Sequence, residues 1–348
     1  ILFVDGTKIR ANAGRRRSHQ RAYYEQLLTD IESRIEQLLA QCEAADQSEE
    51  ETPSYVSMNK ELSKSEHLKE RIKQVLVAFK EEDRKQINQT DPDCAIMHSV
   101  QGSHASYNVQ SVVDEKHGLI VHADATNATS DVNQFARQIE EANSLFSTPC
   151  QVACADAGYA NTDELEKIDQ QGIKVIVPSQ RQALHEEESP FSKSHFTYNK
   201  EQDVYICPEG HMLRYHGTHK RKDKRYYRIV DKKLCLGCKY YGQCTKSRHG
   251  RNIARLRNEE VKLRLEAQYL EESSQEIYAK RKTKAEHPFG HIKSNLKTDG
   301  FLLRQKDGVQ AETSLLATCF NLARMITIFG VHGLIEKMSG LTGLVASC

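Results

Sequence analysis

The sequence contains no tryptophan, and no apolar run approaches the length that a membrane-spanning helix needs. It also has no basic N-terminal region followed by an apolar stretch, so we expect no secretory signal peptide and no membrane partner. Residues 1–4 read Ile-Leu-Phe-Val and resemble the inside of a strand, so we expect the chain to be a fragment of something longer. These absences, with 38% hydrophobic and 28% charged residues, indicate a soluble globular protein.

A large net charge is also absent, but the near balance hides an asymmetry. The formal charge is +1, while residues 201–300 hold 23 Lys or Arg against 13 Asp or Glu, a balance of +10. The other 248 residues therefore sum to −9. A basic third of this kind suits a polyanionic partner, and a merely well-solvated surface is the alternative.

The first half of the chain contains a predicted helical hairpin. Apolar residues recur at spacings of four and three in one helix, the polar stretch 43–55 with Pro53 ends it, and a second amphipathic helix follows. The predicted seam consists of Tyr24, Leu28, Ile31, Ile35, Leu38 and Cys42 in the first helix, and Leu68, Ile72, Val75 and Phe79 in the second.

Five strands are predicted around this hairpin. They cover residues 1–9, 107–113, 119–123, 152–155 and 174–177, with helices over 130–145 and after Thr162. An antiparallel start followed by alternating helices and strands predicts an α/β domain with a mixed five-stranded sheet flanked by helices. Asp5 and Asp156 stand at predicted strand ends, where functional side chains collect in such sheets.

The second half begins with β-prone sequence and ends in helices. Residues 190–245 predict a hairpin and a third strand, and the run from Lys220 to Arg228 interleaves basic and aromatic residues. Residues 257–297 predict helix broken near Pro288, and residues 310–328 predict a final amphipathic helix.

Four of the ten cysteines are clustered, and a Cys-x2-Cys pair within the cluster has a usual zinc-ligand spacing. The cluster consists of Cys207, Cys235, Cys238 and Cys244, and His211 is a fifth candidate ligand. Without a signal peptide we expect a reducing compartment, so a structural zinc site is favoured over disulfides. Buried or free thiols remain the alternative.

Three acidic residues in separate islands suit a metal site for phosphoryl transfer. They are Asp5 in Val-Asp-Gly-Thr, Asp156 in Ala-Asp-Ala-Gly-Tyr, and Glu286 in Glu-His-Pro-Phe-Gly. Carboxylate oxygens are the ligands that Mg²⁺ and Mn²⁺ prefer, and two such ions can act on one phosphodiester. Spacing alone also allows three unrelated structural roles, with Asp5 in a turn, Asp156 at a helix cap and Glu286 on the surface.

These islands resemble the catalytic islands of bacterial insertion-sequence DDE transposases, in particular the IS-four-like group with a Tyr-Arg-Glu-Lys signature. Asp5, Asp156 and Glu286 match the three acidic residues, and Lys293 matches the lysine seven residues after the glutamate. Tyr278 and Arg281 resemble the tyrosine and arginine, one place further upstream than usual. The run Tyr-Asn-Val-Gln at 107–110 and the cysteine module also look like members of this group, and the resemblance spans residues 1–328.

The resemblance implies a ribonuclease-H-like fold with an insertion and a small Cys-rich β subdomain. Family members usually carry a DNA-binding region before the first aspartate, which this chain is expected to lack. The implied segments are the first strand of the catalytic core (1–13), the helical-hairpin insertion (14–92), the catalytic core (93–189), the Cys-rich insertion (190–250), the helical end of the core with Glu286 (251–330), and a tail (331–348).

The resemblance further implies an enzyme that cleaves DNA and transfers strands, works as a homo-oligomer and acts in the cytoplasm of a bacterium, at the nucleoid. Asp5, Asp156 and Glu286 are the expected Mg²⁺ or Mn²⁺ ligands. The expected DNA-binding residues are Tyr278, Arg281, Lys293, Lys220, Arg221, Lys222, Lys224 and Arg225. The alternatives are a non-catalytic DNA-binding remnant or domesticated derivative, a metal-dependent nuclease of the same fold, and a zinc-stabilised interaction protein.

Overall fold

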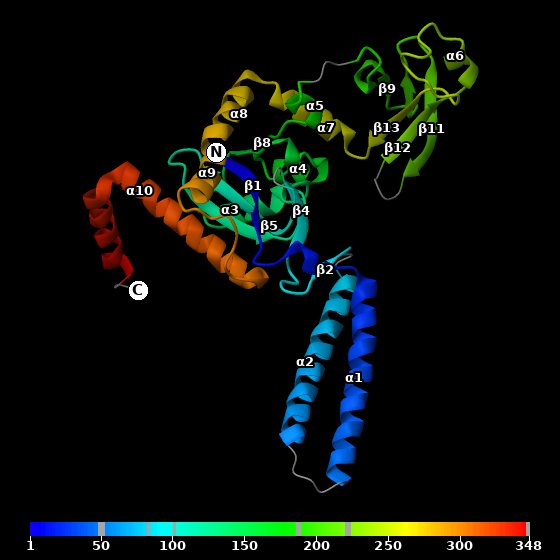
Figure 1. The fold of residues 1–348 in the computed structure, drawn as a ribbon. Helices are drawn as coiled ribbons and strands as arrows, with labels where there is room; N and C mark the ends of the chain where they lie inside the picture. The colour runs from blue at the N-terminus through cyan, green and yellow to red at the C-terminus, as the bar shows by residue number, and fades with distance from the viewer. Residues whose placement is uncertain (48–52, 82–83, 100–101, 186–188, 220–223, 346–348) are drawn as a thin grey trace. The chain divides into compact units, whose positions relative to one another are not determined.

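The computed structural model describes residues 1–47, 53–81, 84–99, 102–185, 189–219 and 224–345 (Figure 1). The chain divides into two compact units, one made of residues 1–150 and 280–348 and the other of residues 151–279. Its described strands pair both antiparallel and parallel and are flanked by helices, so the protein is mixed α/β as the sequence predicts.

The sheet of the first unit is built around one long strand, β5 (Gly102–Asp114). It pairs antiparallel with β1 (Leu2–Arg10), β4 (Ala95–Ser99) and β6 (Ile120–Thr126). The strand β4 is missing from the sequence prediction because its residues do not alternate between polar and apolar. Pairing of β1 continues to Arg10 opposite Ser106, so Asp5 lies inside the strand and not at its end. That expectation is wrong because the Gly6-Thr7 pair is extended and does not turn.

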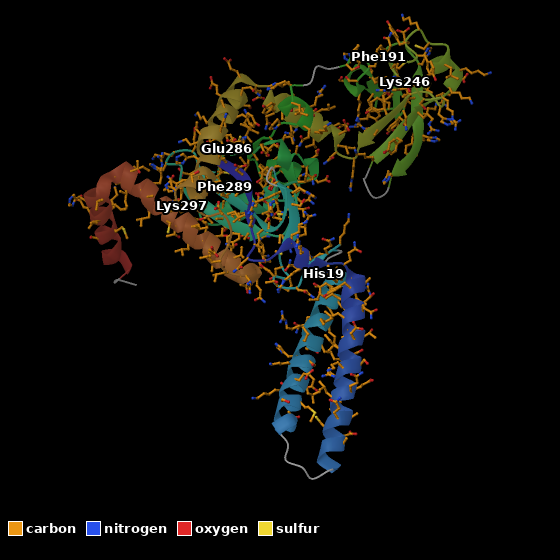
Figure 2. All side chains as sticks on the ribbon, viewed as in Figure 1. His19, Phe191, Lys246, Glu286, Phe289 and Lys297 are labelled. Carbon is orange, nitrogen blue, oxygen red and sulfur yellow. The ribbon has the colours of Figure 1, made fainter. Side chains whose placement is uncertain are left out.

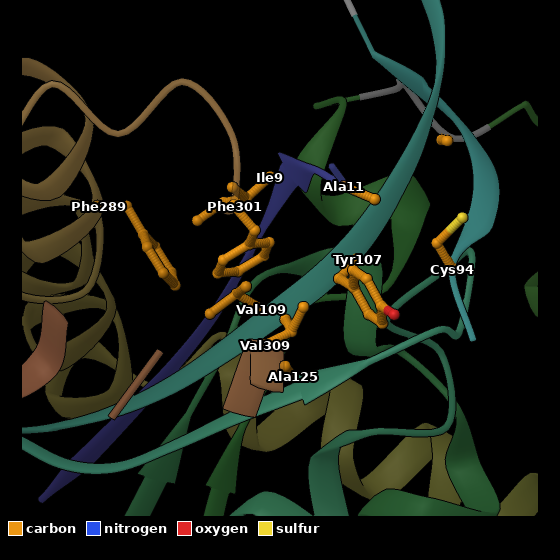
Figure 3. Close-up of a cluster of buried hydrophobic side chains, with 10 residues drawn as sticks. Ile9, Ala11, Cys94, Tyr107, Val109, Ala125, Phe289, Phe301 and Val309 are labelled. Atoms are coloured by element: carbon orange, nitrogen blue, oxygen red, sulfur yellow. The ribbon is translucent and has the colours of Figure 1, made fainter. Parts of the chain in front are cut away.

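Side chains on β1 alternate between the two faces of this sheet, which sets the direction of Asp5. Asp5, Thr7 and Ile9 pair with Ser111, Val109 and Tyr107, so they share one face with these partners. On that face lies a buried apolar cluster that includes Phe289 and Phe301 (Figure 3). Its members are Ile9, Ala11, Cys94, Ala105, Tyr107, Val109, Ala125, Phe289, Phe301 and Val309.

Three helices cover the sheet of the first unit. Helix α3 (Phe135–Asn143) packs on β1, β5 and β6 through Phe135 and Ile139. Helix α9 (Glu286–Ser294) and the first part of α10 (Gln305–Val345) complete the cluster on the face of Asp5. The predicted break near Pro288 is confirmed. It falls at Ala285, between α8 and α9, and Pro288 itself lies in the first turn of α9, where a missing N–H costs no hydrogen bond.

The predicted helical hairpin is present as α1 (Arg21–Gln47) and α2 (Pro53–Glu81), which lie side by side in Figure 1. Its seam buries Tyr24, Ile31, Ile35, Ile72 and Phe79. Leu68 does not belong to the seam, since 42% of it is exposed. A short pair of strands, β2 (Ser18–His19) and β3 (Ile87–Asn88), closes the base of the hairpin, where Tyr24 Oη donates to Ile87 O at 2.8 Å.

Helix α10 continues far beyond the predicted residues 310–328. It bends at Gly330, whose φ of 69° suits glycine, and it runs through much of the tail to which the sequence assigned no structure. Residues Gln305–Ser339 are long and apolar enough to cross a membrane by length and composition, so the expectation that no segment reaches this length is corrected. Val309 and Phe320 of this helix are buried, but only 6% of its most apolar window is buried.

The second unit combines a parallel strand pair with an antiparallel sheet. Strands β7 (Val152–Cys154) and β8 (Lys174–Ile176) are joined through α4 (Thr162–Asp169). Asn161 caps α4, and its side chain accepts the N–H of Asp163. The antiparallel sheet has the order β13-β12-β11-β10-β9, made of Asn252–Leu256, Lys224–Ile229, Met212–His219, Val204–Ile206 and Thr197–Asn199. The remaining helices of this part are α5 (Gln180–Ala183), α6 (Lys232–Leu236), α7 (Glu259–Tyr269) and the start of α8 (Glu272–Lys284), whose residues from Lys280 on belong to the first unit.

Candidate active site

In the first unit, two of the three predicted carboxylates meet at one arginine. Arg281 Nη2 donates to Glu286 Oε1 at 3.0 Å, and Arg281 Nη1 lies 3.8 Å from Asp5 Oδ1. The side chains of Arg281 and Asp5 are each 14% exposed, whereas that of Glu286 is 44% exposed. Glu286 is the first residue of α9 and is labelled in Figure 2. The structure therefore brings together residues 5 and 286 through a partly buried guanidinium.

Lys293 completes this group from the other end of α9. It lies seven residues, or about two turns, after Glu286, on the same side of the helix. Its Nζ donates to Thr7 Oγ1 at 2.5 Å. Partial desolvation of the ammonium group lowers the pKa of Lys293, and the negative charge of Asp5 opposes that shift. A cation held beside an acidic residue in this way is suited to a second anion, such as a phosphate.

Thr7 is the residue of this group that sequence reasoning missed. The signal was present, because Thr7 follows Asp5 by two positions and the period of a strand is two. Thr7 and Asp5 consequently face the same helix.

The remaining predicted residues of the triad and signature belong to the second unit. Asp156 directly precedes a short 3₁₀ turn (Ala157–Tyr159) and caps it, since its Oδ1 accepts the N–H of Gly158 at 2.8 Å. This is the helix-capping role that the sequence left open. One carboxylate oxygen remains available for another ligand. The ring of Tyr278, on α8, stacks edge-on against Tyr269 with centroids 5.1 Å apart.

The four clustered cysteines line a single cavity of about 40 Å³ in the second unit. All four are free thiols. The N–H of His211 points to Cys207 Sγ at 3.3 Å, and the N–H of Arg251 points to Cys235 Sγ at 3.4 Å. Burial raises the pKa of Cys244, the guanidinium of Arg251 opposes this, and the other three thiols of the cluster add to it.

The predicted basic DNA-binding run is described only in part. Lys220, Arg221 and Lys222 lie outside the described residues. Lys224 and Arg225 begin β12, where Arg225 pairs with Asp203 at 2.8 Å and lies over the ring of Tyr215 at 4.9 Å. Asp203 therefore already partly neutralises the guanidinium of Arg225. The ring of Tyr215, over which this guanidinium lies, is exposed.

Within the described part of the chain, no three His, Cys, Asp or Glu residues are placed so that they could hold a metal ion. For the carboxylates, the pairing of Asp5 and Glu286 with Arg281 is consistent with this finding, because a guanidinium takes up the charge that a cation would meet.

Comparison with known proteins bears on the class of this site. Residues 206–326 match a family model described as "Transposase DDE domain". The span contains Tyr278, Arg281, Glu286, Lys293 and the four cysteines, but neither Asp5 nor Asp156. The match supports the resemblance of this chain to a DDE transposase, a class that typically uses divalent metal ions.

Among solved structures, the chain is similar to a piggyBac transposase in a synaptic complex with hairpin DNA. The two share 9% sequence identity with a TM-score of 0.32 over 71% of this chain. The chain spans 45% of the length of that transposase. No curated protein matches the sequence.

Proposed function

We propose that this chain is the catalytic part of a transposase that cleaves DNA and transfers the cleaved strand, on a ribonuclease-H-like core. The observation that carries the proposal is the meeting of Asp5 and Glu286 at Arg281, with Lys293 beside them, in a chain whose C-terminal part matches a transposase domain. Asp5, Asp156 and Glu286 would hold Mg²⁺ or Mn²⁺, which lowers the pKa of a bound water and stabilises charge on the departing oxygen.

The reaction itself is a pair of displacements at phosphorus. The oxygen of water attacks the phosphodiester at the transposon end, the bond from phosphorus to the 3′-oxygen breaks, and that oxygen gains a proton to become a free hydroxyl. The 3′-hydroxyl then attacks a phosphodiester of the target DNA, forming one new phosphodiester and releasing one alcohol. Such reactions depend mainly on positioning and on neutralising charge, which is what these side chains provide.

Cationic and aromatic residues around the carboxylates would position the DNA. Lys293, fixed by Thr7, would contact a phosphate close to the scissile bond. Tyr278 would contact a base or the backbone, and Lys220, Arg221, Lys222, Lys224 and Arg225 would contact phosphates further along the duplex. Paired DNA ends would require a homo-oligomer, and the site of action would be the bacterial nucleoid.

A cleavage assay tests this function. Supercoiled plasmid and a duplex carrying the DNA that flanks the gene are incubated with Mg²⁺ or Mn²⁺ and with wild type, Asp156→Asn or Asp163→Asn. Asp163 serves as a matched control, because it lies seven residues later and its carboxylate accepts from Asn258. We expect metal-dependent nicking by wild type and by Asp163→Asn, and loss of nicking in Asp156→Asn.

The other outcomes separate the alternatives. DNA binding without nicking by any of the proteins would favour a non-catalytic remnant. Nicking without joining of a preformed 3′-hydroxyl end to target DNA would favour a nuclease. Absence of salt-dependent DNA binding would contradict every DNA-directed function of this chain.

A structural zinc ion is a second proposal, independent of the catalytic one. Cys207, Cys235, Cys238 and Cys244 come from the end of β10, from α6 and from the loop after it, yet they line one cavity. Two of their sulfurs already accept hydrogen bonds from backbone N–H groups. Four thiolates would complete a tetrahedral site.

A further inference from the structure

Helix α10 carries apolar side chains on two opposite sides, and only one of these sides is covered by the first unit. Toward the sheet it buries Val309 and Phe320, with Leu316 packed beside them. On the opposite side, apolar residues recur at spacings of four, three, four and three along the helix. These residues, which we call the outer seam, are Leu315, Cys319, Leu322, Ile326 and Phe329.

Every member of the outer seam is open to water. The exposed fractions are 62% for Leu315, 45% for Leu322 and 38% for both Ile326 and Phe329, and Cys319 is an exposed thiol. In the sequence from 313 to 331, the only Lys, Arg, Asp or Glu is Arg324. Arg324 lies on the sheet side of the helix, where its Nε donates to His117 O at 2.9 Å. An uncharged apolar surface of this length that faces water indicates an interaction site.

The spacing of the outer seam indicates that another helix covers it. Alternating steps of four and three residues keep one side of a helix against a neighbouring helix over several turns, as in a coiled coil. The same spacing already pairs α1 with α2 in this chain, where Tyr24, Ile31 and Ile35 are buried at the contact. The outer seam therefore has the pattern of a helix pair, but its second helix is missing from the described part of the chain.

A membrane-spanning position does not fit α10, although its length and composition would allow one. Gln310 forms two hydrogen bonds with the backbone of β6, accepting from Ala125 N at 2.8 Å and donating to Ala123 O at 2.9 Å. Asn321 likewise accepts from the N–H of Ile120 and donates to its carbonyl oxygen, both at 2.8 Å. These two amides hold the helix along β6, and a helix that crossed a bilayer would lose all four bonds.

We propose that the outer seam binds the outer seam of a second copy of this chain, so that the two α10 helices pack along each other across a two-fold axis. A two-fold interface places the same surface on both subunits, so the surface must be complementary to itself. An apolar seam without charged residues meets this condition, because no like charges face each other. The inference goes beyond the proposed function, since this pairing needs neither DNA nor a metal ion.

The exposed apolar surface of α10 is large enough for such a pair. After the bend at Gly330, the steps of four and three residues continue with Val331, Ile335 and Met338, which are 55–57% exposed. Together with the outer seam, these side chains offer several hundred Å² of apolar surface. A standard interface buries about 800 Å² on each partner, so α10 supplies the larger part of what a stable dimer needs.

Leu322 lies at the centre of the outer seam, seven residues from Leu315 and seven from Phe329. Two seams aligned on their centres therefore bring the two copies of Leu322 together, whether the helices run parallel or antiparallel. Cys319 distinguishes the two directions. It meets the partner's Cys319 in a parallel pair and lies near the partner's Ile326 in an antiparallel pair.

The test measures the mass of the purified chain by sedimentation equilibrium over a range of concentrations, without DNA or added metal. Four proteins are compared: wild type, Leu322→Glu, Leu322→Lys and Leu145→Glu. Leu145 is the matched control, because it is 64% exposed in the same unit but does not belong to α10. Wild type and Leu145→Glu should be dimers. Each Leu322 variant should dimerise about 100-fold more weakly, because two like charges would be buried at the centre of the seam.

Mixing the two Leu322 variants guards against misfolding. Glutamate and lysine at the centre of the seam attract each other, so an equal mixture of Leu322→Glu and Leu322→Lys should recover the dimer that each variant alone has lost. A variant that had merely misfolded would not be rescued in this way. Circular dichroism of each variant should also show the helix content of wild type, since Leu322 is exposed in the single chain.

Oxidative cross-linking locates the contact directly. A disulfide between two copies of Cys319, or between Cys319 and the new thiol of Ile326→Cys, identified by peptide mass spectrometry, would support the pairing and give its direction. A dimeric chain that forms neither link would place its interface elsewhere and overturn the proposal.

Three further results would also overturn it. These are a wild-type chain that is monomeric at every concentration, a dimer that Leu322→Glu leaves unchanged, and a monomer that sediments with phosphatidylcholine and phosphatidylglycerol vesicles through Leu322. The last result would assign the outer seam to a lipid surface. None of these measurements uses DNA, so their outcome is independent of the cleavage assay.

Discussion

Lys293 donates a hydrogen bond to Thr7 at 2.5 Å, and this bond ties the end of α9 to the strand that carries Asp5. The two residues are 286 positions apart in the chain. Their contact fixes the direction of the ammonium group relative to Asp5, whose charge acts on it. A positioning role for Thr7 follows, and it can be tested apart from the carboxylates.

Replacing Thr7 with Val should reduce DNA cleavage about tenfold with little loss of stability. Valine keeps the shape of the side chain but removes the acceptor, so Lys293 loses its fixed direction. Cleavage rate and the melting temperature are measured on the same preparations. Thr7→Ser should restore the rate, since it retains the hydroxyl. A Thr7→Val protein that cleaves as fast as wild type would show that the bond has no positioning role.

Replacing Glu286 with Gln should lower cleavage by a factor of about 1,000 or more, because a neutral amide is a poor ligand for a hard cation. Binding of uncleaved duplex should change far less. The matched control is Glu272→Gln, at the exposed start of α8. Cleavage and binding are measured on one labelled duplex. Residual cleavage near that of wild type would remove Glu286 from the catalytic group.

DNA affinity should fall steeply with salt, and the two described basic residues of β12 should contribute unequally. Lys224→Gln should reduce the slope of log affinity against log salt concentration by about 1. Arg225→Gln should reduce it less, because Asp203 already neutralises that guanidinium. Fluorescence anisotropy at several salt concentrations measures both slopes. Equal slopes for wild type and Lys224→Gln would exclude a phosphate contact by that lysine.

The purified chain should contain one zinc ion, and Cys238→Ser should lose it. The serine hydroxyl is a poor zinc ligand, so only three thiolates remain and the tetrahedral site lacks its fourth ligand. Metal content is measured by mass spectrometry after removal of weakly bound ions. Cys319→Ser and His211→Ala are the controls, and both should retain zinc. Replacement by Co²⁺ gives a further check, since its spectrum distinguishes four sulfur ligands from three sulfurs and a nitrogen. A zinc-free wild-type chain whose four thiols all react rapidly would contradict the site.

Phe289→Ala should destabilise the first unit by about 3–5 kcal/mol, because it leaves a cavity in the cluster beneath α9. Leu302, which is 80% exposed, is the control, and Leu302→Ala should change stability by less than about 0.5 kcal/mol. Chemical denaturation measures both. A small effect of Phe289→Ala would indicate that α9 is not held on the sheet by this side chain.

Some parts of this protein were predictable because their signals are local. The spacing of Tyr24, Ile31 and Ile35 is that of a helix seam, and these residues are buried in the hairpin. Leu68 has the same spacing pattern in the second helix but is exposed. A seam between two helices has a limited width, and the register of one helix against the other depends on the side chains of both. The predicted first strand, residues 1–9, is shifted by one residue from β1, because the end of a strand depends on its pairing with a distant strand.

In the candidate site too, local features could be predicted from the sequence and contacts between distant residues could not. The sequence alone singled out the candidate residues: the islands around Asp5 and Glu286, the lysine two turns after Glu286, and the spacing of the cysteines. These are properties of short segments, in which side-chain chemistry and helix or strand period suffice. Only the tertiary structure decided that Arg281 faces both Asp5 and Glu286 and that Thr7 fixes Lys293. Such partners are far apart in the chain, and their approach depends on how strands and helices pack, which no local pattern encodes.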